Sequence, residues 1–421
     1  MYNMSDDLEN DNKSLQVYND MYMNQLQKKK FPTICFATMC KNEEHCIRKT
    51  LESVAPFIDT WVVCDTGSTD KTCEIVEEFF REKGIVGELF HDEWKRFDYN
   101  KSLLFERCQN RADYIMHFDA DDYITGAEFD KSCLESRKDL YLMLFKRGTF
   151  DYKAHTIFNG AFRWKLYGVA HNVIKPIGVT RAITEGSIET PGLYVCCEGV
   201  GSRAFDPKKY LYDAVKLEKQ MNDCLIEDPD NLYTRSIFYT AQSYMDYGDF
   251  VKAAQYYKMY IHTKDTWNEE LFESYLRYAQ CLMTIKDKQL DKEMGIEITY
   301  ERIMDEMQKA MDLFGDRAEP YFILGKYLNQ NSQCELSYKY LKKATEMDFE
   351  KAKSKYILFV RRDCYGAPIY DELAVSCYWT ERVEEGIQAL LGHVFKDKEY
   401  YEANKERLDQ NKIFFGKKLI G

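Results

Sequence analysis

The N-terminal part of the chain alternates apolar runs, polar loops and amphipathic stretches. Residues 31–39 and 60–64 are short apolar runs that favour β-strands, and each ends in a polar loop. The segments that follow, 47–54 and 72–82, carry apolar residues at helical spacing. Repeated strand, loop and helix units predict a parallel sheet, in which ligands bind beyond the carboxyl ends of the strands.

Residues 114–122, YIMHFDADD, pass from an apolar run into three carboxylates. If the strand stays extended, Asp119 and Asp121 project to the same side. Neighbouring carboxylates repel each other by about 1 kcal/mol in water and about 4 kcal/mol at a protein-surface dielectric, so such a cluster is typical of a site for a hard divalent cation. The alternative is an Asp-rich turn whose side chains cap backbone groups.

The pattern changes near residue 208, beyond which long amphipathic helical patterns are separated by short breaks. Residues 231–260 fit one helix-turn-helix repeat of the tetratricopeptide type, and residues 320–344 fit a weaker copy. The residues that carry the first repeat are Ala241, Tyr244, Gly248, Asp249, Ala253, Tyr257 and Tyr260. We therefore expect three segments: a flexible N-terminal arm at 1–30, an α/β domain at 31–207 and an all-α domain at 208–421.

Composition limits the function classes. The chain has 421 residues, 45% of them hydrophobic, which is enough for two cores. A net charge of −12 argues against nucleic acid as a partner, and no apolar run approaches the roughly 18 residues of a membrane span. The N-terminus lacks the apolar core of a signal peptide, and the 14 cysteines form no C-x-x-C pair. We predict reduced cysteines and a cytoplasmic location.

Four motifs in order identify a family. They are CKNEE (40–44), VVCDTGSTDKT (62–72), DYNKSL (98–103) and HFDADD (117–122). Together they resemble the family 2 glycosyltransferases of GT-A fold, and most of all the branch with tetratricopeptide repeats after the catalytic domain. The resemblance implies an α/β GT-A domain with a Rossmann-like mixed sheet. It also implies an inverting transfer of sugar from a nucleotide-sugar donor, usually a UDP-sugar, to a glycan or protein acceptor.

The resemblance also assigns donor contacts. The acid at the end of the second strand, here Asp65, hydrogen-bonds the nucleotide base, and a carboxylate suits the imide N–H of uracil. The loop after the first strand contacts the nucleoside, through Thr38, Asn42 and Glu44.

Three further residues are implied to lie near the base or the phosphates. Asn100 and Lys101 match an Asn-Arg pair of the family. The lysine is a departure that keeps the positive charge and loses the bidentate fork of arginine. Arg203 matches a GSR-x-x-DP segment and is expected to reach the phosphates, although the stretch around it also fits an interdomain linker.

A metal ion is implied as well. Mn²⁺ or Mg²⁺ bound by Asp119 and Asp121 stabilises the leaving diphosphate, and His171 is a third candidate ligand. Asn172 stands where the family usually has Glu, so a general base at that position is not expected. The remaining candidates for the base are Asp122, Glu185, Glu189 and Glu198, which the sequence does not separate.

Two alternatives to this enzyme remain. One is a non-catalytic scaffold, a degenerate transferase whose helical repeats bind a partner; Lys101 and Asn172 favour it, whereas the intact Asp65 and Asp-x-Asp favour the enzyme. The other is a nucleotidyltransferase, disfavoured because no Gly- and Arg-rich loop follows the first strand. The helical half either selects the acceptor or supports the catalytic domain and forms a homodimer.

Overall fold

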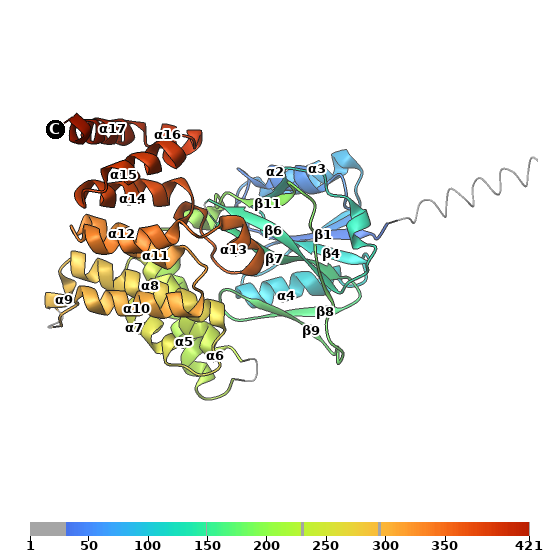
Figure 1. The fold of residues 1–421 in the computed structure, drawn as a ribbon. Coiled ribbons are helices and arrows are strands. Elements are labelled where there is room, and N and C mark those ends of the chain that lie inside the picture. Colours follow the sequence, from blue (N-terminus) through green and yellow to red (C-terminus); the bar gives the residue numbers. More distant parts are fainter. Residues whose placement is uncertain (1–30, 149, 229–230, 294–295, 421) are drawn as a thin grey trace, which may run out of the picture.

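The computed structural model describes residues 31–148, 150–228, 231–293 and 296–420 (Figure 1). The arm expected at 1–30 lies outside these ranges. Within them an α/β part is followed by a stack of helices, which confirms the expected fold class (Figure 1). In the part of the chain described, no helix combines the length and the apolar character that crossing a membrane requires.

The expected strands and helices of the first half are present. The strands are β1 (Ile34–Cys40), β2 (Thr60–Asp65), β3 (Gly87–His91), β4 (Tyr114–His117), β5 (Asp122–Thr125), β6 (Leu140–Arg147), β7 (Phe150–Asn159), β8 (Arg163–Tyr167), β9 (Val173–Ile177), β10 (Glu185–Ser187) and β11 (Tyr194–Cys197). The α-helices of this part are α2 (Ile47–Val54), α3 (Thr72–Lys83) and α4 (Phe97–Cys108).

The main sheet is mixed. Its strand order is β3-β2-β1-β4-β7-β6-β11-β5, with β10 beside β6. β1 pairs in parallel with β2 and β4, and β2 with β3, as the sequence predicts. β7 runs antiparallel to both β4 and β6, so β6 points the same way as β4. β11 is parallel to β6. The carboxyl ends of β1, β2, β3, β4, β6 and β11 therefore meet at one edge.

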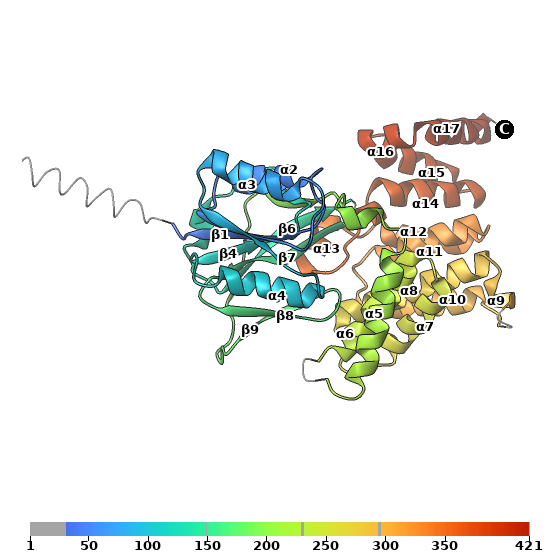
Figure 2. The same ribbon diagram turned by 180° about the vertical axis from the view of Figure 1, so that it is seen from behind.

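Alternate side chains of β1 pack into two different hydrophobic cores, one on each face of the sheet. Ile34 and Phe36 pack in the core that α2 and α3 cover, whereas Cys35 and Ala37 pack in the core under α4. Figure 2 shows the helices in these places, α2 and α3 on one face of the sheet and α4 on the other. Burial of β1 on both faces explains why its sequence is almost continuously apolar.

The second half is helical throughout its described ranges. Its α-helices are α5 (Lys209–Cys224), α6 (Tyr233–Tyr247), α7 (Phe250–Ile261), α8 (Asn268–Asp287), α9 (Leu290–Glu293), α10 (Tyr300–Leu313), α11 (Glu319–Gln330), α12 (Cys334–Ala344), α13 (Phe349–Lys355), α14 (Ala367–Trp379), α15 (Val383–Ala389), α16 (Lys398–Ala403) and α17 (Lys405–Ile420). The predicted turn between α6 and α7 is confirmed: Gly248 has φ 95°, and Asp249 accepts a hydrogen bond from the Lys252 N–H at 3.0 Å.

The two halves touch beside the sheet edge that carries the loops. The Val169 N–H donates to the Gln220 side chain of α5 at 2.8 Å, and Arg235 of α6 donates to the His171 carbonyl at 3.0 Å. α13 lies next to the sheet in both views (Figures 1 and 2). The chain leaves β11 at Cys197 and enters α5 at Lys209, on either side of the proposed boundary at 207/208.

Close packing of α11 on α12 generates the first prediction. A Cβ added at Gly325 would lie 2.5 Å from Cγ of the fully buried Leu341. We expect Gly325→Ala to lower the free energy of unfolding by about 1–3 kcal/mol, because the core must shift to admit the methyl group. Denaturant unfolding measures the change.

The matched control is Gly416→Ala in α17, where no atom lies within 4 Å of the added Cβ. It should raise stability by up to about 1 kcal/mol, because alanine favours a helix over glycine. If both variants gained stability, the close helix packing at Gly325 would be wrong.

Candidate functional site

The acidic segment leaves its strand earlier than the sequence suggests. β4 ends at His117, and the Asp122 N–H donates to the Asp119 carbonyl at 3.1 Å, which closes a turn. The condition for Asp119 and Asp121 to project to the same side, an extended strand through Asp121, is therefore not met, and the segment forms the Asp-rich turn that was the alternative. The turn arises because β5 begins at Asp122 and runs antiparallel to β11.

Two buried hydroxyl groups fix this acidic turn from below. Thr38 of β1 donates to the Phe118 carbonyl at 3.0 Å, and Thr50 of α2 donates to the Ala120 carbonyl at 2.7 Å. Thr38 is fully buried, so its side chain supports the turn. Because Thr38 is buried and its hydroxyl group is bound to the Phe118 carbonyl, the structure shows no surface of Thr38 that could make the predicted contact with a nucleoside.

The carboxylates of the turn differ in environment. Lys101 of α4 forms an ion pair with Asp119 at 2.8 Å and lowers the pKa of that carboxyl to about 2. Asp121 accepts a hydrogen bond from the Gly201 N–H at 2.8 Å. Asp122 is buried, and burial followed by the charge of Asp119 raises its pKa to about 8.

The donor set of the turn fits a hard cation only in part. Asp119 is ionised and its side chain is 62% exposed, so a cation can reach its carboxylate beside the Lys101 ion pair. Among the described residues, however, neither Asp119 nor Asp121 belongs to a preformed group of three donors. Mg²⁺ and Mn²⁺ accept such partial sites, since one or two carboxylates, water and substrate phosphates complete their coordination.

His171 lies against the helical half. Its backbone has φ 48°, and its ring stacks on Tyr239 of α6 with centroids 3.9 Å apart. Desolvation of the ring, and then the charge of Arg235, lowers the pKa of His171 to about 3. The imidazole is therefore neutral at pH 7, as a metal ligand must be. It does not form a preformed donor group with Asp119 and Asp121.

Asp65 ends β2 as a buried acceptor. Its carboxylate accepts hydrogen bonds from the Gly67 and Ser68 N–H groups, each at 3.1 Å, and lies 3.5 Å from Nδ1 of His91. Burial alone would raise the pKa of Asp65, but the hydrogen bonds from Ser68 and Gly67 outweigh it, so the pKa is lowered. The group is ionised at neutral pH and held in one orientation.

Asn42 and Glu44 lie at the same edge and brace its loops. Asn42 accepts a hydrogen bond from the Thr69 N–H at 2.8 Å, and its φ is 57°. Glu44 accepts one from the Lys71 N–H at 3.0 Å, just before α3. The loops after β1 and β2 are thereby joined, and Asp70 accepts a hydrogen bond from the Thr72 N–H at 3.0 Å.

The Asn100 side chain makes its hydrogen bonds within the protein and not toward the expected donor site. Its side chain is fully buried, accepts from the Lys95 and Arg96 N–H groups at 2.9 and 3.2 Å, and donates to the Glu93 carbonyl at 2.9 Å. All of its amide groups are thus used to shape the loop after β3. The neighbouring Lys101 is the member of the pair that points into the site.

Arg203 joins the two halves. Its guanidinium forms an ion pair with Asp213 of α5 and lies over the Phe97 ring at 5.1 Å. The structure therefore places Arg203 in an interdomain contact, which agrees with the linker alternative for this segment. Asn172 donates to the Gly168 carbonyl within its own turn.

Comparison with known proteins adds the family. The sequence profile of glycosyl transferase family 2 matches residues 35–136, the stretch that carries β1 to β5. Residues 35–136 are a family 2 glycosyltransferase domain. The mixed sheet agrees with the GT-A architecture of that family, and no curated protein sequence matches the chain.

Solved structures show weaker likenesses. TarS 1–349 from S. aureus has 14% identity and a TM-score of 0.30, over 67% of this chain and 89% of that one. MamA from Desulfovibrio magneticus RS-1 has 16% identity and a TM-score of 0.30, over 44% of this chain and 92% of that one. Likenesses at this level are too weak to support an argument about this chain.

Two of the four candidates for the general base lie at the edge that carries the site. Asp122 pairs with Cys197 across β5 and β11, and Glu198 follows β11 directly. Glu198 is bound by Lys49 at 2.8 Å and by the Tyr123 hydroxyl at 2.6 Å. Of these two candidates, therefore, one is buried and the other is engaged by two neighbours.

The other two candidates lie elsewhere. Glu185 is in β10, beside the first residue of β6, which places it at the opposite edge of the sheet, where His155 binds it at 2.7 Å. Glu189 is exposed and forms an ion pair with Lys153 at 2.6 Å. The structure does not bring Glu185 to the acidic turn.

Sequence reasoning missed two polar side chains of this edge, Arg147 and His91. Arg147 ends β6, and its charge helps to lower the pKa values of both Asp119 and His171. His91 ends β3 beside Asp65. His91 could have been found, because β3 follows the same strand rule as β2. No local sequence pattern indicates Arg147, because its placement depends on β7, which lies between β4 and β6 and runs antiparallel to both.

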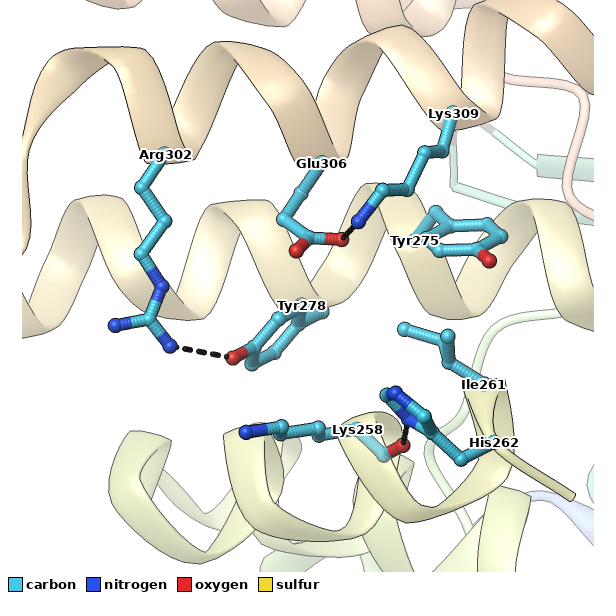
Figure 3. Close-up of a pocket in the computed structure, with 8 residues that line it drawn as sticks. All are labelled: Lys258, Ile261, His262, Tyr275, Tyr278, Arg302, Glu306 and Lys309. Atoms are coloured by element: carbon cyan, nitrogen blue, oxygen red, sulfur yellow. Dashed lines mark hydrogen bonds and ion pairs between the residues drawn. The ribbon is translucent and has the colours of Figure 1, made fainter.

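A separate pocket of about 270 Å³ lies in the helical half, between α7, α8 and α10 (Figure 3). Its lining residues are Lys258, Ile261, His262, Tyr275, Tyr278, Arg302, Glu306 and Lys309. Lys309 pairs with Glu306 at 2.9 Å, and Arg302 donates to the Tyr278 hydroxyl at 3.0 Å. Within the described ranges, Lys258 and Arg302 have no carboxylate partner. The pocket is thus basic in an acidic protein.

The support under the acidic turn generates the second prediction. Thr50→Val should lower the free energy of unfolding by about 1–3 kcal/mol, because the Ala120 carbonyl loses its buried donor. Chemical denaturation measures the change. Thr345→Val, whose exposed hydroxyl donates to the Lys342 carbonyl at 2.7 Å, is the control and should change stability by no more than about 0.5 kcal/mol. Equal effects at both sites would contradict the structural role of Thr50.

Proposed function

We propose that the protein is a metal-dependent, inverting glycosyltransferase that moves a sugar from a UDP-sugar to a glycan or protein acceptor. The observation that carries the proposal is the placement of Asp65, Asp119 and Asp121 at one edge of the sheet in a family 2 domain. Ligands of such sheets bind at that edge, beyond the strand ends.

The proposed role of Asp65 is to accept the imide N–H of uracil. Its carboxylate is ionised, fixed by two backbone N–H groups and 3.5 Å from Nδ1 of the exposed His91. A rigid, charged acceptor makes a hydrogen bond of about 1.5–3 kcal/mol and discriminates against bases that lack a donor at that position.

The diphosphate would lie between the acidic turn and two cations. Lys101 already contacts Asp119, and Arg147 ends the neighbouring β6. We propose that both neutralise charge on the leaving group, Lys101 as a point charge. Asp119 and Asp121 would hold Mn²⁺ or Mg²⁺, which when bound supplies Lewis-acid stabilisation of the leaving diphosphate.

Binding tests the donor assignment and is the third prediction. Titrating UDP-, GDP- and TDP-sugars with Mn²⁺ present should give metal-dependent binding of the UDP-sugar to the wild-type chain. Asp65→Asn and Asp121→Asn should each weaken it by about tenfold or more, the loss of one charged hydrogen bond or ligand.

Glu185→Gln is the matched control, because it removes a carboxylate at the opposite edge and should bind as the wild type does. If no donor bound to the wild-type chain, the scaffold alternative would replace the enzyme. The Lys101 ion pair on Asp119 would then be a permanent substitute for the metal.

We further propose that the helical half holds an anionic group of the acceptor. Three cations, Lys258, Arg302 and Lys309, line the pocket of Figure 3 together with one carboxylate, that of Glu306, although the whole chain carries a charge of −12. Figure 3 shows the Lys258 and Arg302 side chains on either side of the Tyr278 hydroxyl. Such a group of donors suits a phosphate ester on a sugar.

A sugar phosphate tests the pocket and gives the fourth prediction. Glucose 6-phosphate should bind in calorimetry where glucose does not, and added salt should weaken the binding. Arg302→Glu and Lys258→Glu should each abolish it, whereas Lys339→Glu on the exposed face of α12 should leave it unchanged. Equal binding by all variants would remove the pocket from the proposal.

A further inference from the structure

A second group of metal-ligating side chains lies where the nucleobase is proposed to bind. Asp65 at the end of β2, Cys73 in the first turn of α3 and His91 at the end of β3 offer an oxygen, a sulfur and a nitrogen atom. These three donor atoms all lie within 4.8 Å of one another. Carboxylate, thiolate and imidazole are the ligand types that Zn²⁺ binds in proteins, whereas Mg²⁺ prefers oxygen alone.

Only small movements separate this arrangement from a tetrahedral site. Zinc bonds of about 2.0–2.3 Å place neighbouring ligand atoms about 3.3–3.8 Å apart. Nδ1 of His91 is already 3.5 Å from Oδ2 of Asp65. The His91 side chain is 68% exposed and free to rotate toward the metal, whereas Asp65 is held by the backbone N–H groups of Gly67 and Ser68. Hydrogen bonds of that kind orient a ligand before the metal arrives.

We propose that Asp65, Cys73 and His91 bind Zn²⁺, with a water molecule as the fourth ligand. As the zinc–sulfur bond forms, the Cys73 thiol releases its proton to solvent, and no electrons are transferred. The Asp65 carboxylate and the Cys73 thiolate then balance the charge of the ion, while His91 binds as a neutral imidazole through Nδ1. Occupation of the site covers the lone pairs of Asp65.

A regulatory consequence rests on the proposed function. If Asp65 accepts the nucleobase, Zn²⁺ and the donor compete for the same carboxylate. Zinc at this position would inhibit donor binding without touching the acidic turn at Asp119 and Asp121. Micromolar zinc would then act opposite to Mn²⁺, which assists the donor.

A neighbouring cluster provides a strict comparison. Glu43, His45 and Cys46 also bring three donor atoms within 4.8 Å. There, however, Nε2 of His45 donates to the Val200 carbonyl at 2.7 Å, and Glu43 accepts a hydrogen bond from the Ser202 N–H at 3.1 Å. The ring nitrogen of His45 that faces Glu43 is Nε2, 4.0 Å from Oε2, and it carries the proton donated to Val200, so that nitrogen has no lone pair for a metal and this second cluster is the poorer site.

Metal titration tests the proposal and is the fifth prediction. The full chain, freed of metal with a chelator, is titrated with Zn²⁺ against a coloured chelator, and with Co²⁺ in an absorption spectrometer. One ion should bind per chain, and Co²⁺ should show tetrahedral d–d bands with a thiolate charge-transfer band. Cys73→Ser should abolish the thiolate band, and both Cys73→Ser and His91→Ala should weaken binding by at least about tenfold.

Cys46→Ser is the matched control and should bind as the wild type does. Loss of the thiolate band in Cys46→Ser rather than in Cys73→Ser would overturn the proposal, as would the absence of the band in the wild-type chain. Thermal unfolding without metal identifies a variant that fails to fold; for such a variant, Cys73→Ala replaces the serine.

Competition separates the two proposals. Zn²⁺ should weaken binding of UDP to the wild-type chain and leave the Cys73→Ser variant unaffected. If UDP failed to bind even without zinc, the proposed function would fail, while the cobalt spectrum would still decide the zinc site. If UDP bound and zinc bound at Cys73 without competing, the overlap of the two sites would be refuted.

Discussion

Parallel pairing of β1 with β2 on one side and with β4 on the other is the constraint on which the remaining structure depends. It brings three polar loops to one edge, although helices α2, α3 and α4 separate them in the sequence. The cores on the two faces of β1 stabilise this pairing, because side chains that point to either face of the strand are buried. A slip of one residue would move every apolar side chain of β1 to the opposite face.

The loops at this edge are held mainly by side chains that first look like ligand contacts. Asn42 and Glu44 join two loops, Asn100 shapes a third, and Thr38 supports the acidic turn. Their polar groups form hydrogen bonds with backbone groups. Such bonds commonly hold a site rigid before its ligand binds. What is left for a ligand is a small set of charged groups, with Asp65 as its most firmly placed member.

Much of this fold can be predicted from the sequence, because the periodicity of apolar residues indicates where strands and helices lie. The strand-to-loop junction at Asp65 and the helical turn at Gly248 both follow from local patterns. The turn at Asp119 does not follow from a local pattern, because the chain stops being extended where β5 pairs with the distant β11. The remote position of Glu185 and the nearness of Arg147 likewise depend on strand reversals that no local pattern records.

The central claim is that the edge formed by β1, β2 and β4 binds a nucleoside diphosphate through Asp65 and, with a metal, through Asp121. A crystal structure of the chain with UDP and Mn²⁺ tests it most directly, because manganese is located by its anomalous scattering. The account predicts uracil against Asp65 and a manganese peak at the acidic turn. Nucleotide bound at another place, or manganese away from Asp119 and Asp121, would contradict it.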